Sequence, residues 1–183
     1  MAVTALGMVE TLSIPLGILA GDFMLKTAQV SLVTAQAVCA GKYIVLVNGE
    51  VAAVQASVAA GVEAAGMKLV DSLVIPNVDR RVIAALAGAA DLENVEALGV
   101  LETFSLAAAV RAADTCVKTA EVELLEVRLA RGMGGKSFVT LSGAVAAVEA
   151  AVKAAEADEA SQGMLSQSVV IPSPHPDLIR AVL

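Results

Sequence analysis

The feature that most constrains the fold of this chain is an internal repeat. The segment Ala5–Ser13 (ALGMVETLS) recurs 92 positions later as Ala97–Ser105 (ALGVLETFS). Ser72–Pro76 (SLVIP) recurs 96 positions later as Ser168–Pro172 (SVVIP), so the second copy contains short insertions. A repeat of roughly 90 residues is the size of one domain. The sequence therefore predicts two copies of one domain, residues 1–92 and 93–183.

Within each copy the hydrophobic period changes in a regular order. In the first copy, strand-like runs cover residues 6–11, 30–38, 43–47 and 69–75, and helical spacing covers residues 14–28, 51–65 and 79–87. A short turn at residues 39–42 predicts a hairpin between the second and third strands. The order β-α-β-β-α-β plus a helix predicts an α+β fold, a ferredoxin-like sandwich built twice and unpermuted, with two helices on one face of an antiparallel sheet. Residues 89–96 are the predicted linker.

Composition removes several classes of function. The chain is 57% hydrophobic, yet no segment reaches the ~18 uncharged apolar residues of a spanning helix, so we expect a soluble, cytoplasmic protein without a membrane partner. A net charge of −7 disfavours a nucleic-acid partner. The single histidine, His175, removes most catalytic triads and metal sites that one chain can form, and we expect no enzyme.

Several motifs recur in the same order in both copies. They are ALGMVET at residues 5–11, GDFMLKTA at 21–28, the Gly-Lys of the hairpin, and the Ile-Pro that opens the terminal IPSPHPD at 171–177. Over nearly the whole chain they resemble the shell proteins of bacterial microcompartments (BMC), and within that family the tandem-domain trimers of the propanediol-utilisation type. The resemblance implies a structural protein of a cytoplasmic microcompartment shell. It further implies a homotrimer that mimics a hexagonal tile, with other shell proteins and an encapsulated redox enzyme as partners.

The resemblance also places the hairpin of each copy at a central pore. Three symmetry-related Cys39 residues would then ligate one [4Fe–4S] cluster per trimer. Such a cluster normally takes four thiolates. The function that the resemblance implies is electron transfer across the shell. Taken without the resemblance, a lone cysteine in a turn is a small, partly buried packing residue. Ala40 stands where relatives can carry proline. The implied pore loops are Ala40, Gly41 and Lys42 in the first copy and Arg131, Gly132, Met133, Gly134, Gly135 and Lys136 in the second.

Two lysines occupy equivalent positions in the two copies. Lys26 and Lys118 each follow an aspartate by four residues, which on spacing alone predicts an ion pair on a solvated helix face. The resemblance instead places both lysines at the edge of the tile. It places Asn77, Ser173 and His175 there too, where relatives often carry an arginine at the Ser173 position.

Three other residues receive more modest predictions. Glu10 and Glu102 match at the ends of two predicted strands, and we expect each to have a structural role, such as holding a turn. Cys116 lies in a helical pattern and is expected to fill the core.

Three alternatives to a cluster-bearing tile remain open. One is a plain pore-forming shell trimer that passes small metabolites without a cluster. The others are a redox carrier that works alone and a small-molecule-binding module of the ferredoxin-like kind. Sheet formation by the isolated protein separates the tiles from the stand-alone proteins.

Overall fold

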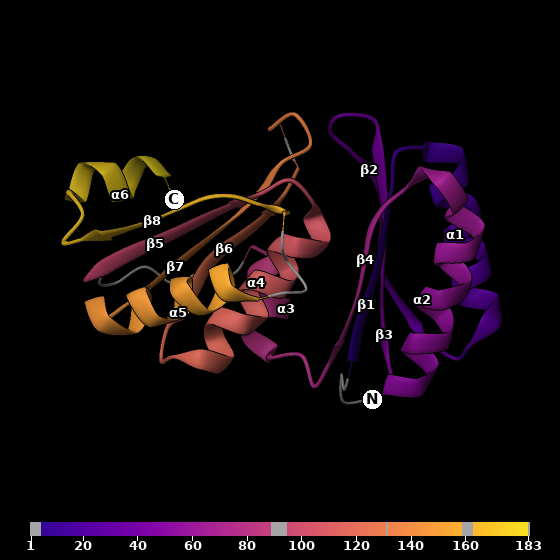
Figure 1. Ribbon diagram of the computed structural model, residues 1–183, viewed down its shortest axis with the longest axis horizontal. Helices are drawn as coiled ribbons and strands as arrows, with labels where there is room; N and C mark the ends of the chain where they lie inside the picture. The colour runs from indigo at the N-terminus through magenta and orange to yellow at the C-terminus, as the bar shows by residue number, and fades with distance from the viewer. Residues whose placement is uncertain (1–4, 89–94, 131, 159–162, 183) are drawn as a thin grey trace. The chain divides into compact units, whose positions relative to one another are not determined.

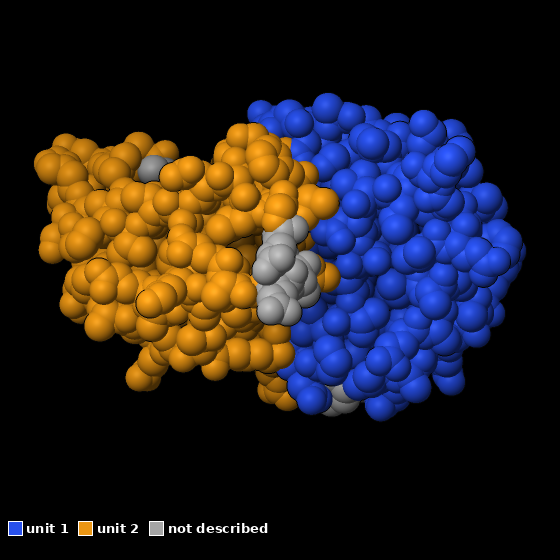
Figure 2. All heavy atoms as spheres, viewed as in Figure 1, with its two compact units in different colours: residues 1–78, 105–107, 130–135 blue, residues 79–104, 108–129, 136–183 orange. Residues whose placement is uncertain are grey.

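The computed structural model describes residues 5–88, 95–130, 132–158 and 163–182. Its contacts divide the chain into two compact units, coloured separately in Figure 2. The first unit holds residues 1–78, 105–107 and 130–135, and the second holds residues 79–104, 108–129 and 136–183. The predicted linker and the boundary after residue 92 fall largely outside the described residues, so this boundary stays a prediction.

The first unit is built on a four-stranded antiparallel sheet in the order β2-β3-β1-β4. Two helices lie side by side on one face of this sheet (Figure 1), and a short 3-10 turn leads into the last strand. This arrangement confirms the predicted ferredoxin-like sandwich. The elements are β1 (Ala5–Thr11), α1 (Ile14–Thr27), β2 (Ser31–Val38), β3 (Lys42–Gly49), α2 (Val51–Ala65), η1 (Gly66–Lys68) and β4 (Leu69–Pro76).

The second unit repeats this sheet in the order β6-β7-β5-β8. It also contains α3 (Arg80–Leu86), which closes the first repeat in the sequence but packs against β6. Its other elements are β5 (Ala97–Thr103), α4 (Leu106–Thr119), β6 (Glu123–Leu129), β7 (Ser137–Gly143), α5 (Val145–Ala157), β8 (Leu165–Pro172) and α6 (Pro176–Val182). Among the described helices, none is long and apolar enough to cross a bilayer.

The helices of the first unit approach the sheet closely because the residues that face it are small. A Cβ added at Gly17 of α1 would lie 2.5 Å from the Tyr43 Cβ of β3, and one at Gly61 of α2 would lie 2.6 Å from the Met24 Cγ of α1, so the two helices also pack closely on each other. Both distances are too short for real atoms. α1 buries Gly17, Ala20 and Gly21 together with Met24, whereas several of its other large apolar side chains, among them Ile14, Ile18 and Leu25, are exposed.

Candidate functional site

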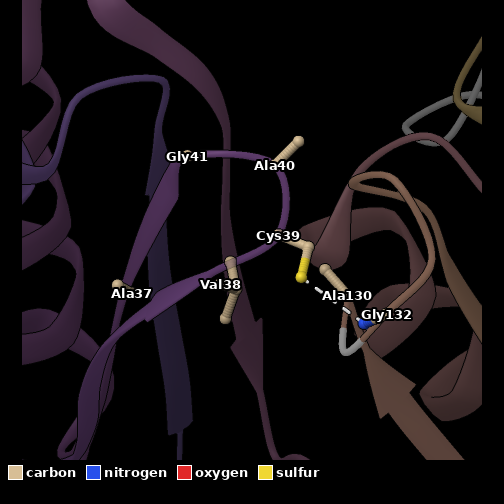
Figure 3. A pocket seen from close by; sticks show the side chains of 7 residues that line it. All are labelled: Ala37, Val38, Cys39, Ala40, Gly41, Ala130 and Gly132. Carbon is tan, nitrogen blue, oxygen red and sulfur yellow. Dashed lines mark hydrogen bonds between the residues drawn. The ribbon is translucent and has the colours of Figure 1, made fainter.

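The Cys39 thiol lies at the tip of the β2–β3 hairpin, in an open hollow of the first unit (Figure 3). The backbone holds the residue on two sides: Cys39 N donates to the Ala130 carbonyl at 3.1 Å, and Gly132 N donates to Cys39 Sγ at 3.4 Å. Gly41 and Gly132 have φ values of 76° and 75°, a conformation that glycine adopts without strain. Neither residue adds a side chain to the hollow. The hollow measures about 470 Å³ and is lined by Ala37, Val38, Cys39, Ala40, Gly41, Ala130 and Gly132.

This geometry fits a thiolate that binds a metal cluster together with other copies of the chain. A backbone N–H is directed at the sulfur, as is common around metal-bound thiolates, and the described residues that line the space beside it have small side chains without charge. Within the described residues, no group of three or more His, Cys, Asp or Glu side chains is placed to hold a metal ion. Of the described residues that line this hollow, Cys39 is the one that could offer a sulfur ligand.

The other cysteine lies in a different environment. Cys116 is fully buried in the second unit, and its Sγ donates to the Ala151 carbonyl at 3.5 Å. Burial raises the pKa of this thiol to about 12, so it stays protonated at neutral pH. Its position agrees with the predicted packing role.

A buried ion pair joins Lys42, at the start of β3, to Glu10 of β1 in the first unit. Lys42 Nζ donates to Glu10 Oε1 at 2.7 Å and to the Gly135 carbonyl at 2.9 Å. The second carboxylate oxygen of Glu10 accepts from the backbone N–H of Leu106 at 2.7 Å and of Ala107 at 3.4 Å, the first residues of α4. Burial raises the pKa of Glu10, against the opposing effect of Lys42 and the two N–H groups. Glu10 thus has a structural role, as expected, and it caps a helix of the other repeat.

The equivalent pair in the second unit is open to solvent. Lys136 Nζ donates to Glu102 Oε2 at 2.7 Å, and both side chains are 40% exposed. Ser166 Oγ donates to the same oxygen at 3.0 Å, and the Lys136 ammonium lies 5.5 Å from the centre of the Phe104 ring. The hydrogen bonds from Lys136 and Ser166 lower the pKa of Glu102. The same two residue types are therefore buried in one repeat and half-exposed in the other.

In the second unit, Asp79 and Arg81 fix the position of α3, the C-terminal helix of the first repeat. The Arg81 guanidinium donates to the carbonyls of Val117 at 2.9 Å and Val122 at 3.0 Å. Its ion pair with Asp79 lowers the pKa of that carboxyl to about 2. Asp79 N in turn donates to Asp114 Oδ1 at 2.9 Å, and Asp79 caps α3 as the sequence predicts.

The predicted edge lysines form the ion pairs that their spacing indicates. Lys26 pairs with Asp22 at 2.7 Å on an exposed face, and Lys118 pairs with Asp114 at 2.5 Å, where the carboxylate is buried. Their role at a tile edge is not visible in one chain and stays a prediction.

The remaining predicted residues fall in turns. Asn77 and Ser173 follow the last strand of each repeat with positive φ values of 51° and 48°. His175 Nδ1 accepts from Asp177 N at 3.1 Å at the start of α6. Of the predicted pore residues, Arg131 lies outside the described residues, whereas Met133 and Gly134 lie in the loop of the first unit that includes Gly132 and Gly135.

Comparison with known proteins identifies the family. The BMC domain model matches residues 5–78 and 97–174, one match in each repeat. The chain is 40% identical over 179 residues to the bacterial microcompartment shell protein PduT of Citrobacter freundii, covering 98% of this chain and 97% of that protein. It is 31% identical over 190 residues to the carboxysome assembly protein CcmO of Synechococcus elongatus, covering 96% of this chain and 67% of that one.

A solved structure extends the likeness to three dimensions. The crystal structure of a microcompartment protein from Desulfitobacterium hafniense DCB superposes with a TM-score of 0.85 at 51% identity, and the match covers 98% of this chain and 99% of that one. The matches run from end to end and include both repeats. The chain therefore belongs to the BMC-domain family, as a tandem-domain microcompartment shell protein of the PduT type.

Proposed function

We propose that three copies of this shell protein close head to tail into a pseudohexagonal tile, and that Cys39 of each copy holds one shared [4Fe–4S] cluster on the threefold axis. Other shell proteins surround the tile, and an encapsulated redox enzyme exchanges electrons through it. The observation that carries the cluster is the Cys39 thiol in its open hollow, with the Gly132 N–H directed at the sulfur.

The buried Glu10–Lys42 pair supports head-to-tail closure, because it shows which backbone groups a pair of this kind binds when a second repeat covers it. Glu10 and Lys42 bind backbone groups of residues 105–107 and 130–135, which come from the second repeat. Their half-exposed counterparts, Glu102 and Lys136, require the equivalent segments of a first repeat, residues 13–15 and 38–41. A second copy of the chain supplies those segments, and a contact that uses different surfaces on each partner closes into a ring when the rotation allows it.

The C-terminal helices of the two repeats support the same closure. On α3, Val82 is fully buried, and β6, the strand that α3 contacts, buries Leu124. Their counterparts in the other repeat are Leu178 on α6, which is 43% exposed, and Leu32 on β2, which is also exposed. Packing α6 of one copy on β2 of the next would bury both leucines, and each fully buried leucine contributes about 1.5–3 kcal/mol.

The residues around Cys39 support its role as a ligand. When bound, a [4Fe–4S] cluster supplies one-electron transfer. The chain presents one sulfur per copy and donates the Gly132 N–H to it. The small side chains of the hollow leave room beside the thiol, and the buried Lys42 anchors the neighbouring loop through the Gly135 carbonyl.

Anaerobic purification followed by native mass spectrometry and an iron and sulfide assay tests both parts. We expect a trimer with about four irons per trimer, the content of one such cluster. Cys39→Ser should lose the iron and remain a trimer, while the matched variant Cys116→Ala should keep both.

Two outcomes would contradict the proposal. A trimer without iron after anaerobic purification would favour a plain pore for small metabolites. A monomer would contradict the tile and favour a module that works alone. Leu178→Glu gives an independent check of closure, since it should yield monomers, whereas Met67→Gln, which changes a fully exposed residue, should not.

A further inference from the structure

The turn that carries Cys39 is held on one side by its own chain. The Gly135 backbone lies directly against this turn, because a Cβ added to Gly135 would lie 3.5 Å from Ala40 N and 3.6 Å from the Cys39 carbonyl oxygen. Lys42 Nζ secures this contact, since it donates to the Gly135 carbonyl at 2.9 Å and is itself anchored on Glu10. The lysine of one Gly-Lys motif therefore binds the glycine of the other.

The second Gly-Lys motif has the same chemistry in a more open setting. Lys136 is anchored on Glu102 at 2.7 Å, as Lys42 is on Glu10 at the same distance. The Lys42 side chain is 10% exposed, whereas that of Lys136 is 40% exposed. An ammonium group has three N–H donors, so it can reach a carbonyl while it keeps its carboxylate. The reciprocal carbonyl belongs to Gly41, the glycine of the first motif.

We propose that Lys136 of one copy donates to the Gly41 carbonyl of the next copy in the proposed tile, and that this contact fixes the second side of the Cys39 turn. The inference rests on the proposed function and deepens it, because a neighbouring copy then contributes a positioning residue to each Cys39. Head-to-tail closure supplies the geometry, since each second repeat in the ring is followed by the first repeat of the next copy. Each Cys39 turn then lies between Gly135 of its own chain and Lys136 of the neighbour.

The local alternative is that Lys136 is satisfied inside its own repeat. It pairs with Glu102 and lies 5.5 Å from the centre of the Phe104 ring. The first repeat argues against this alternative, because Lys42 keeps its carboxylate and still donates to Gly135. A Glu–Lys pair at this position can therefore serve a second repeat, and for Lys136 that repeat belongs to another copy.

The contact also brings positive charge close to the sulfur. Gly41 lies two residues from Cys39 on the same turn (Figure 3), so three Lys136 ammonium groups would surround the axis of the tile. The described residues that line the Cys39 hollow have no charged side chain. Electron uptake at this axis adds negative charge, and the potentials of iron–sulfur centres depend on the net charge and hydrogen bonds around them. Lys136 should therefore raise the midpoint potential of a cluster held by Cys39.

Two substitutions at one position test the contact. Lys136→Met removes the ammonium group and keeps the length of the side chain, whereas Lys136→Arg keeps a cationic donor. In iron-free trimers of Lys136→Met we expect amide hydrogen exchange of residues 38–42 to rise roughly tenfold, because a hydrogen bond from a charged donor is lost. In the iron-loaded trimer the midpoint potential should become more negative. Lys136→Arg should restore much of both properties, and Lys153→Met, which removes an exposed lysine of α5, should match the parent.

Cross-linking identifies the chain that supplies the lysine. A short reagent that joins a thiol to an amine should link Cys39 to Lys136 in the iron-free parent trimer, and the product should run as a chain dimer on a denaturing gel. Mixed trimers of unlabelled and nitrogen-15-labelled chains should contain linked peptides of unequal label. Such peptides show that the link joins two copies.

The outcomes separate this inference from the proposed function. Unchanged exchange and potential in Lys136→Met, or Cys39–Lys136 links found only within one chain, would overturn the inference. A Lys136→Met protein that no longer forms trimers would show that Lys136 closes the tile, and would overturn its role in positioning Cys39. A parent trimer without iron would overturn the cluster while exchange and cross-linking still test the lysine contact, and a monomeric parent would overturn the tile itself.

Discussion

Replacing Asp79 by alanine tests how the C-terminal helix of a repeat is held in place. The Asp79 carboxylate accepts from the backbone N–H of Arg81 at 2.9 Å and forms an ion pair with its guanidinium. The guanidinium also reaches the carbonyls of Val117 and Val122. Asp79→Ala removes the helix cap and the ion pair, while the bonds from Arg81 to the two carbonyls can persist.

The size of the effect follows from the pKa of Asp79. The ordinary value of 3.8 falls to about 2 in the fold, chiefly because of the side-chain hydrogen bond from Arg81. That difference corresponds to about 2.4 kcal/mol at 1.36 kcal/mol per pH unit. A quarter of the side chain is exposed, so solvent screening reduces this figure. The loss of the cap, about 1 kcal/mol, overlaps with it, and we expect a total loss near 2 kcal/mol at pH 7.

Urea unfolding followed by circular dichroism, together with hydrogen exchange of α3, measures the loss. Because the folded pKa is lowered, the stabilisation is complete above about pH 4 and disappears as the pH falls towards 2. The gap between parent and variant should therefore shrink over that range. Asp22→Ala, which breaks an exposed pair worth at most about 0.5 kcal/mol, is the control. Equal stabilities at pH 7, or a gap that is unchanged near pH 2, would refute the reasoning.

Three further predictions concern buried groups. Glu10→Ala should lower the free energy of unfolding by about 3–5 kcal/mol in urea titrations, because it leaves the buried Lys42 ammonium without its carboxylate. Gly61→Ala should cost about 1 kcal/mol or more in the same assay, despite the better helix propensity of alanine, because its Cβ would meet Met24 Cγ at 2.6 Å. In a Cys39→Ser background, Cys116 should react with a thiol reagent at pH 8 only after unfolding, since its pKa of about 12 leaves almost no thiolate; rapid labelling of this folded variant would contradict the prediction.

The order and bounds of most elements can be predicted from the sequence because they depend on local periodicity. The predicted helix at residues 51–65 coincides with α2, and the hairpin turn at residues 39–42 falls where β2 and β3 meet. The second copy strengthens each assignment, since the same pattern occurs twice. The face that a helix buries is harder to predict: in α1 the small residues face the sheet, and the apolar spacing that indicates the helix marks its exposed side.

The site could be predicted only in part. Cys39 stands out as the one cysteine in a turn, but the N–H that reaches it belongs to Gly132, 93 residues away. The cap that Glu10 provides to Leu106 is equally remote, and no local pattern encodes which sheet receives α3. The recurrence of Glu10 and Lys42 as Glu102 and Lys136 is the signal that could have revealed this pair beforehand.

The joining of two repeats in one chain has a consequence for how this protein can change over evolution. In a ring of six single-repeat chains, every substitution appears six times around the pore and on every edge. In the proposed trimer it appears three times, so one half of the positions can acquire a new property while the other half preserves the lattice. The pairs Cys39 and Arg131, and Phe23 and Thr115, illustrate that divergence within a single gene product.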